Sequence, residues 1–284
     1  MKKGLILEGG AMRGLFSAGI MDILMEHEIL FDGAIGVSAG AVFGCNYKSR
    51  QPGRVIRYNT AQCKNPRYCS YRSLLRTGDL FGKEFCYHTL PDTIDRFDHE
   101  AYRSNPMEFY SVSADLETGL AVYHRCDDVT GDKIDWLRAS ASMPLLSRIV
   151  EIDGYKLLDG GVADAIPLRY FESLGYDRNV LILTHPKDYV CREEPMLQRA
   201  IDRFYRRYPR FCDTMRNKHT VYNDTLDDIR QKERAGEIIV LRPDVPLPVR
   251  RIEHNADRMR ATYEIGRRVG MESLETIQAF LKNR

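Results

Sequence analysis

Short apolar runs that alternate with helix-like segments constrain the fold of this chain more than any other feature. The apolar runs are bounded by turn residues, and apolar residues between them recur with the period of a helix. The order strand, helix, strand at this spacing predicts a largely parallel sheet covered by helices on both sides. The predicted strands are residues 5–7, 31–37, 109–114, 120–123, 148–152, 155–158, 180–184 and 238–241, and the clearest helices are 15–28, 132–141 and 167–174.

The character of the sequence changes after about residue 186. A helical stripe of apolar residues is followed by a long polar stretch, one more strand and a terminal helix. We therefore expect residues 1–185 to form an α/β core that carries the chemistry. Residues 186–284 are expected to form a mostly helical C-terminal extension packed on that core.

Composition excludes several classes of protein. Hydrophobic residues make up 43% of the 284 and charged residues 29%, which is ordinary for a globular protein. No segment approaches the about 18 consecutive apolar residues that a membrane-spanning helix needs. Lys2 and Lys3 are followed by too few apolar residues for a secretory signal, so we expect a cytoplasmic location. Oligomeric state is left open by the sequence.

The seven cysteines indicate reduced thiols, because their number is odd and no CxxC pair occurs. Cys63, Cys69, Cys86 and His88 are close in sequence, but their gaps match no familiar zinc-ligand spacing. We expect no metal and no cofactor.

Two segments are strongly basic although the net charge is only +2. Residues 48–76 contain eight Lys or Arg residues and no acidic residue, and residues 198–211 contain five arginines and one aspartate. Both could be ordinary solvated faces or the wall of a lid. The alternative is peripheral contact with anionic lipid at the inner membrane surface, with Arg54, Arg57 and Arg67 as docking residues. No nucleic-acid partner is expected.

The stretch AIGVSAGAVFG contains the pattern G-x-S-x-G, formed by Gly36, Ser38 and Gly40, at the end of a predicted strand and the start of a predicted helix. A nucleophile on such a strained turn sits above the sheet, and nearby side chains would collide with neighbouring backbone. The two glycines remove those side chains. Alone, the pattern also fits a turn of small residues that lets strand and helix pack closely.

A glycine-rich loop, residues 9–14, lies between the first strand and the first helix. Its backbone amides can hold an anion at the helix N-terminus. The anion could be a pyrophosphate, or the oxyanion of an acyl-transfer intermediate. The pyrophosphate reading is the weaker one, because the acid it requires should end the second strand, whereas Asp32 begins it. The loop consists of Gly9, Gly10, Ala11, Met12, Arg13 and Gly14.

The proton of Ser38 needs an acceptor. An α/β-hydrolase would supply a histidine, for which His185, His219 and His254 are the candidates. The other candidate is Asp159, which ends a strand and is followed by Gly160 and Gly161. Because parallel strands bring their C-terminal ends to one edge of a sheet, Asp159 could reach Ser38 directly.

The motifs GGAMRG, GVSAG, SADLETG, ASASMP and DGG, in this order over about residues 4–170, resemble the patatin-like phospholipases, the bacterial members especially. The resemblance implies a three-layer α/β/α sandwich, a catalytic dyad without histidine, and hydrolysis of acyl esters of phospholipids or neutral lipids without a metal. Ser38 would be the nucleophile, Asp159 the base, and the loop from Gly9 to Met12 the oxyanion hole. Burial in an apolar acyl pocket would raise the pKa of Asp159 and make it a better base.

Two positions depart from the family pattern. Ala11 stands where a third glycine is common, so the loop there should keep a negative φ or shift slightly. An asparagine common after DGG is replaced by Ala165, beside Asp164, which leaves the support of this loop open.

Three other functions compete with a dyad lipase. The first is an esterase with a Ser-Asp-His triad, the second a nucleotide- or anion-binding module that uses residues 9–14, and the third a catalytically silent interaction protein.

Overall fold

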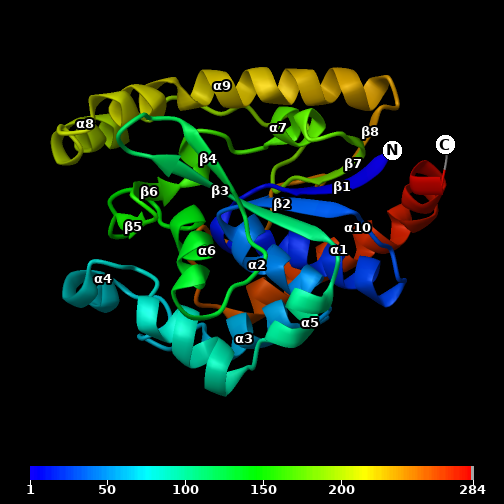
Figure 1. Ribbon diagram of the computed structural model, residues 1–284, viewed down its shortest axis with the longest axis horizontal. Coiled ribbons are helices and arrows are strands. Elements are labelled where there is room, and N and C mark those ends of the chain that lie inside the picture. The colour runs from blue at the N-terminus through cyan, green and yellow to red at the C-terminus, as the bar shows by residue number, and fades with distance from the viewer. Residues whose placement is uncertain (283–284) are drawn as a thin grey trace.

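The computed structural model describes residues 1–282. Its centre is a sheet of eight strands in the order β5-β6-β3-β2-β1-β7-β8, with β4 paired to β3 as well (Figure 1). Five strands, β1, β2, β3, β7 and β8, pair in parallel, and β4, β5 and β6 are antiparallel to their neighbours. The strands are β1 (Lys2–Leu7), β2 (Gly33–Val37), β3 (Glu108–Asp115), β4 (Ala121–Arg125), β5 (Val150–Ile152), β6 (Tyr155–Asp159), β7 (Tyr176–Ile182) and β8 (Ile238–Leu241).

Helices cover both faces of this sheet (Figure 1). They are α1 (Gly14–Glu26), α2 (Ala39–Lys48), α3 (Arg54–Gln62), α4 (Tyr71–Thr77), α5 (His99–Ser104), α6 (Asp135–Ser140), α7 (Leu168–Ser173), α8 (Pro195–Phe204), α9 (Pro209–Arg234) and α10 (Ala256–Lys282). Shorter turns are the 3-10 segments η1 (Ala11–Arg13), η3 (Gly131–Ile134) and η4 (Gly160–Val162) and the π-helical segment η2 (Phe85–Ile94). The predicted three-layer α/β/α architecture, with a helical C-terminal part, is confirmed.

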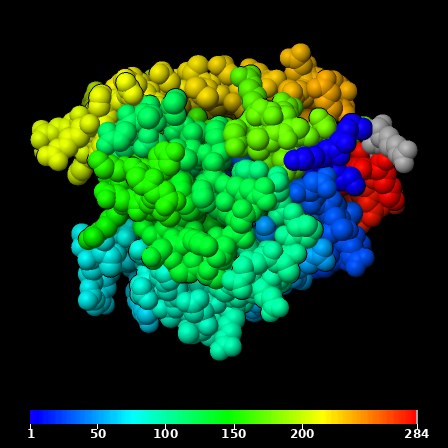
Figure 2. Space-filling view, viewed as in Figure 1, coloured from blue at the N-terminus to red at the C-terminus, as the bar shows by residue number. Residues whose placement is uncertain are grey.

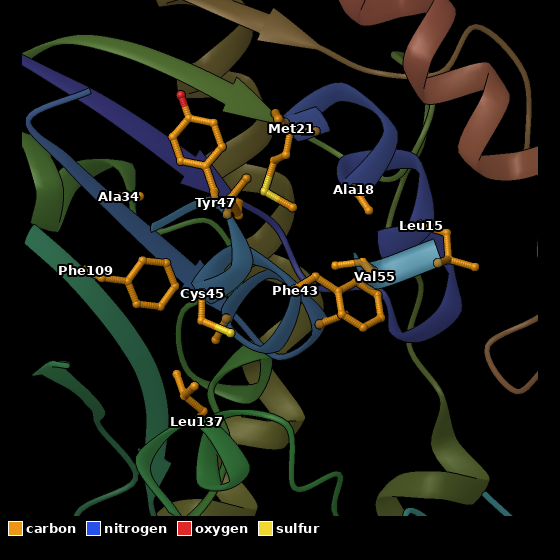
Figure 3. Packing of buried hydrophobic residues seen from close by; sticks show 14 of the residues in the cluster. Leu15, Ala18, Met21, Ala34, Phe43, Cys45, Tyr47, Val55, Phe109 and Leu137 are labelled. Atoms are coloured by element: carbon orange, nitrogen blue, oxygen red, sulfur yellow. The ribbon is translucent and has the colours of Figure 1, made fainter. Parts of the chain in front are cut away.

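Burial on both faces explains why the central strands are continuously apolar. In β1, Leu5 and Leu7 pack with α1 and α2, whereas Ile6 between them packs with α7 and α9 on the other face. Strand side chains alternate between faces, so a strand between two helical layers needs apolar residues at every position. Figure 3 shows the first of these cores, where residues of the sheet (Ala34, Phe109), α1 (Leu15, Ala18, Met21) and α2 (Phe43, Cys45, Tyr47) form one cluster.

One edge of β3 is shared by two strands that meet end to end. β2 runs parallel to β3 and ends at Val37, which is opposite Val112. β6 runs antiparallel to β3 and ends at Asp159, which is opposite Ser113. Ser38 and Asp159 were expected to be close because two parallel strands end side by side. That reason is wrong, because β6 is antiparallel to β3. The two strand ends instead face each other along β3.

The C-terminal part contributes to all three layers. β8 extends the sheet beyond β7, α9 covers one face, and α10 packs on α1 on the other. The proposed division at residue 185 stays a prediction. No helix among residues 1–282 is both long and apolar enough to cross a membrane.

The contact between α1 and α10 is made through glycines. A Cβ at Gly266 would lie 2.0 Å from the carbonyl oxygen of Phe16, and a Cβ at Gly19 would lie 2.1 Å from that of Tyr263. The two helix backbones therefore touch directly, and a methyl group at either position would force them apart.

We expect Gly266→Ala to lower the free energy of unfolding by about 1–3 kcal/mol, because overpacking outweighs the better helix propensity of alanine. Urea unfolding measures this. Gly270→Ala is the matched control on α10, since its Cβ would lie 3.2 Å from Cα of Ile20 and should cost less. A Gly266→Ala protein as stable as wild type would contradict the direct backbone contact.

Candidate active site

Ser38 lies on a strained turn between β2 and α2. Its backbone has φ 55° and ψ −122°, a conformation that costs a non-glycine residue about 1–3 kcal/mol. Glycines make the turn possible: a Cβ at Gly36 would lie 2.4 Å from the carbonyl oxygen of Gly40, and a Cβ at Gly40 would lie 2.3 Å from that of Leu7. The turn presents the hydroxyl group of Ser38 at the N-terminus of a ten-residue helix.

The Ser38 hydroxyl donates a hydrogen bond of 2.6 Å to Oδ2 of Asp159. The other carboxylate oxygen, Oδ1, accepts a bond of 2.8 Å from the amide of Gly161. Burial raises the pKa of Asp159, although the bonds from Ser38 and Gly161 and the charges of Lys218 and Arg251 act in the opposite direction. The pair is thus a hydroxyl group bonded to a buried carboxylate whose basicity is increased.

Ser140, the last residue of α6, fixes the turn from the other side. The amide of Ser38 donates to Oγ of Ser140 over 2.9 Å, and the amide of Asp159 donates to the carbonyl oxygen of Ser142 over 2.8 Å. The segment 140–142 therefore holds both members of the pair. No role for Ser140 is predicted from the sequence, although the residue lies in the ASASMP motif.

The loop 9–14 lies against Ser38 and contains amides that have no protein acceptor among the described residues. A Cβ at Gly9 would lie only 2.9 Å from Cβ of Ser38, which shows how close the loop comes. Within residues 1–282, the amides of Gly9, Gly10 and Ala11 donate to no protein acceptor, whereas the amide of Met12 donates to the carbonyl oxygen of Arg251 and later amides close the η1 turn. Three donors beside a serine hydroxyl suit a developing negative charge.

Ala11 has φ 50°, in the left-handed region. The expectation of a negative φ at this position is wrong: the backbone keeps the conformation that favours glycine, and alanine accepts the strain. The physical reason is that the loop must turn from β1 into η1 between Ser38 and Thr184, whose Oγ1 would lie 2.7 Å from a Cβ on Gly10. Little space remains for an altered path.

The loop after Asp159 is supported without the common asparagine. The amides of Ala163 and Asp164 both donate to the carbonyl oxygen of Gly160, and the Asp164 carboxylate accepts from the Tyr123 hydroxyl over 2.8 Å. Gly160 has no room for a side chain, because its Cβ would lie 2.1 Å from the carbonyl oxygen of Val112.

None of the three downstream histidines bonds to Ser38 or Asp159. His185 Nδ1 lies 3.4 Å from the Tyr222 hydroxyl and 3.5 Å from Oε1 of Glu8. His219 Nε2 lies 3.2 Å from Oε1 of Glu193, and His254 Nδ1 lies 2.7 Å from the carbonyl oxygen of Cys63. Only His185 shares a cavity with Ser38, and its ring nitrogen is turned toward Glu8.

Two cavities meet at Ser38. One, of about 110 Å³, is lined almost entirely by apolar side chains between α2, α3 and η2, including Val42, Tyr58 and Leu90. The other is wider, about 350 Å³, and contains Asp159, the loop 9–14 and charged residues of the C-terminal part. Ser38, Ala11 and Met143 line both. The site therefore has one apolar arm and one polar arm.

The first basic segment, residues 48–76, is exposed only in part. Arg54 is buried, with its Nη1 donating to Oδ1 of Asn46 over 2.7 Å and its guanidinium group over the rings of Tyr58 and Phe97. Arg57 is bonded to both carboxylate oxygens of Asp95. The expectation that Arg54 docks on a membrane is therefore wrong, because its buried charge is used inside the protein.

No group of three or more His, Cys, Asp or Glu side chains within residues 1–282 could hold a metal ion. All seven cysteines are free, and five of them are buried.

A family model described as "Patatin-like phospholipase" matches residues 5–172, and one described as "Domain of unknown function (DUF6363)" matches residues 208–282. "Uncharacterized protein YjjU" of Escherichia coli is 25% identical over 296 residues, which cover 98% of this chain and 78% of that protein. An uncharacterized NTE family protein of Mycobacterium tuberculosis is 28% identical over 58% of this chain and 27% of its own length. "Lysophospholipase nte1" of Aspergillus niger is 27% identical over 61% of this chain and 11% of its own length.

The conformation of Ala11 generates a prediction. A left-handed alanine costs roughly 1–2 kcal/mol, and glycine loses about 0.4–1 kcal/mol through its greater freedom in the unfolded chain. We therefore expect Ala11→Gly to leave the free energy of unfolding unchanged or to raise it by up to about 1.5 kcal/mol. Ala261→Gly, at an exposed position inside α10, should lower it by about 0.5–1 kcal/mol. Equal losses in the two variants, measured by urea unfolding, would show that Ala11 is not strained.

Proposed function

Because this chain belongs to the patatin-like phospholipase family, we propose that it is a serine lipid acyl hydrolase that cleaves carboxylic esters of phospholipids or related lipids. Ser38 is the nucleophile, Asp159 the base, and the loop 9–14 the oxyanion hole. The observation that carries the proposal is the 2.6 Å hydrogen bond from the Ser38 hydroxyl to the buried Asp159 carboxylate. A hydroxyl group bonded to a base of raised pKa, beside free amides, is suited to acyl transfer.

The reaction begins when Oγ of Ser38 attacks the ester carbonyl carbon and its proton passes to Oδ2 of Asp159. The carbonyl oxygen becomes negative and accepts hydrogen bonds from amides of the loop 9–14, each worth on the order of 3 kcal/mol. The C–O bond to the alcohol then breaks, and Asp159 returns the proton to the leaving oxygen. In the second half, Asp159 takes a proton from water, which attacks the acyl-enzyme, and Ser38 leaves with that proton.

The two arms of the site divide the substrate. The apolar arm of about 110 Å³ receives the start of the acyl chain, because chain methylene groups gain about 0.8 kcal/mol each from leaving water. The wider arm holds the alcohol part of the ester and admits water for the second half of the reaction. This arrangement fits a lipid ester with one apolar and one polar end.

The competing functions have less support. A triad would require a histidine bonded to Asp159 or Ser38, and within residues 1–282 none is so placed. A nucleotide module would use the amides of the loop 9–14 for phosphate, but this loop lies against Ser38, since a Cβ at Gly9 would be 2.9 Å from Cβ of Ser38. Intact Ser38 and Asp159 also argue against a catalytically silent interaction protein.

We expect Ser38→Ala and Asp159→Asn each to lower kcat for a soluble short-chain p-nitrophenyl ester at least about a thousandfold, because each removes a group that acts on the reacting atoms. Steady-state kinetics measures this. His185→Gln, His219→Gln and His254→Gln are the matched controls and should change kcat no more than a few fold. A histidine variant as inactive as Asp159→Asn would replace the dyad by a triad.

The same ester tests the ionisation of Asp159. The base must be deprotonated, so activity is present above its pKa and is lost as the pH falls through it. Since burial raises the pKa of Asp159, the acid limb of kcat/KM should lie above the ordinary aspartate value of about 3.9. Circular dichroism at each pH verifies that the protein stays folded. An acid limb at or below pH 4 in folded protein would contradict this role of burial.

The protein also has a surface suited to an anionic membrane. Helices α4 and α8 project from the same end of the molecule (Figures 1 and 2). Leu75 on α4 is 88% exposed and Phe204 on α8 is 73% exposed, whereas Leu197 of α8 lines the wider cavity. The exposed arginines around them are Arg72 and Arg76 on α4, and Arg203, Arg206, Arg207 and Arg210 on and after α8. Apolar tips surrounded by positive charge favour docking on anionic lipid beside the substrate entrance.

We expect Leu75→Glu combined with Phe204→Glu to weaken binding to vesicles containing anionic lipid at least about tenfold. The reason is that each of the two apolar side chains contributes about 1.5–3 kcal/mol when it moves from water into the membrane. Hydrolysis of the soluble ester should stay unchanged. Leu30→Glu is the control, because Leu30 is 59% exposed and precedes β2 at the end opposite Ser38. Cosedimentation in which the double variant binds like wild type would exclude this surface.

A further inference from the structure

We propose that the wider cavity contains a binding subsite for the phosphate group of the substrate lipid, formed by Arg13, Lys218 and Arg251. The inference rests on the proposed function and deepens it, because it assigns the substrate to phosphate-bearing acyl esters. Two of the three residues come from the C-terminal part, in the region that matches the domain of unknown function. That region would then supply headgroup recognition.

The three cations come from separate segments and converge on one space. Arg13 ends η1, Lys218 lies in α9, and Arg251 lies between β8 and α10. All three line the cavity that also contains Ser38 and Asp159. Lys218 and Arg251 are close enough for their charges to act on the Asp159 carboxylate. Among the charges that act on Arg13, that of Glu8 is the largest and that of Arg251 comes next.

These cations lack close counterions inside the protein. Within residues 1–282, no carboxylate oxygen lies within 4.0 Å of the charged groups of Arg13 or Lys218, and Arg251 has only the half-exposed Glu194 at 3.9 Å. Nε of Arg13 is buried without a hydrogen-bond partner. A buried donor without an acceptor costs about 1–3 kcal/mol, so Arg13 is not fully satisfied by protein groups, and its side chain lines the cavity.

The two carboxylates of this cavity cannot serve as those acceptors. Asp159 accepts from Ser38 and Gly161, as described above. Glu8 is bonded to Thr184, through the amide and the hydroxyl, and to the Tyr222 hydroxyl. Both carboxylates therefore accept hydrogen bonds from other protein donors. The three cations outnumber the two carboxylates in the lining of this cavity, which leaves an excess of positive charge for a ligand.

A phosphate group fits these donors better than a neutral alcohol. Two guanidinium groups and one ammonium group approach from different segments, and the tetrahedral oxygens of phosphate accept charge-assisted hydrogen bonds in several directions. In a glycerol lipid the phosphate is joined to the acyl ester through a short glycerol unit. A lipid with its ester at Ser38 can therefore place its phosphate in the same cavity of about 350 Å³.

The test compares two esters that differ only in phosphate, 1-octanoylglycerol 3-phosphate and 1-octanoylglycerol. Calorimetry measures their binding to the full chain carrying Ser38→Ala, so that neither is consumed. Lys218→Met and Arg251→Gln are each added to this background, and Lys187→Met is the control, because Lys187 is exposed and lies outside the cavity. Binding of the neutral ester reports whether each variant keeps its fold. Inorganic phosphate is titrated as a third ligand.

We expect the phosphate ester to bind at least about tenfold more tightly than the neutral ester, and Lys218→Met and Arg251→Gln each to reduce that ratio about tenfold. Lys187→Met should leave it unchanged. A ratio near one, or a ratio that neither variant changes, would overturn the subsite. Inorganic phosphate that binds as tightly as the phosphate ester would identify a free-phosphate site instead of a lipid headgroup site.

Hydrolysis of the same two esters by the chain with Ser38 intact separates this inference from the proposed function. A preserved binding preference without any hydrolysis would overturn the hydrolase but support the subsite. Hydrolysis of both esters with equal kcat/KM and no binding preference would support the hydrolase and overturn the subsite.

Discussion

The hydrogen bond between Ser38 and Asp159 joins residues that are 121 positions apart, and the rest of the site depends on it. It forms because β2 and β6 end against each other on one edge of β3. A change in the register of either strand would move one partner by a residue and turn its side chain to the other face of the sheet. The apolar cores on the two faces of the sheet hold these strands in register, and they therefore position Ser38 and Asp159 as well as stabilise the fold.

The stability of this core offsets several unfavourable features at the site. Ser38 and Ala11 have positive φ, Asp159 is a carboxylate removed from water, and Arg13 has a buried donor without a partner. Each costs free energy in the folded protein, and each is useful for the proposed reaction: an exposed nucleophile, free amides, a stronger base and an anion-binding group. Their concentration around one pair of cavities is itself an argument for function at this place.

Local signals in the sequence were sufficient for part of this account. The turn at Ser38 and the loop 9–14 were predictable, because glycines next to predicted strands indicate tight turns or a close approach of backbone segments. The partnership with Asp159 was predictable from the order of motifs, but the end-to-end meeting of β2 and β6 was not, because strand direction depends on distant pairing. The positive φ of Ala11 was not predictable, because the loop before it is confined by Ser38 and Thr184, which are remote in sequence. Arg54 appeared as a surface charge because its partners, Asn46 and Asp95, are invisible to a count of basic residues. Lys218 and Arg251 carry no motif, and only the packing of the C-terminal part brings them to the site.

The most direct test of the central claim is covalent labelling of the full chain by a fluorophosphonate probe, with mass spectrometry to locate the modified residue in wild type and in Asp159→Ala. The account predicts that the probe modifies Ser38 in the wild-type protein and that modification is lost or much slower in Asp159→Ala, because the hydroxyl has lost its base. Folded wild-type protein that stays unmodified at Ser38, or equal labelling rates in the two proteins, would contradict a nucleophile activated by Asp159.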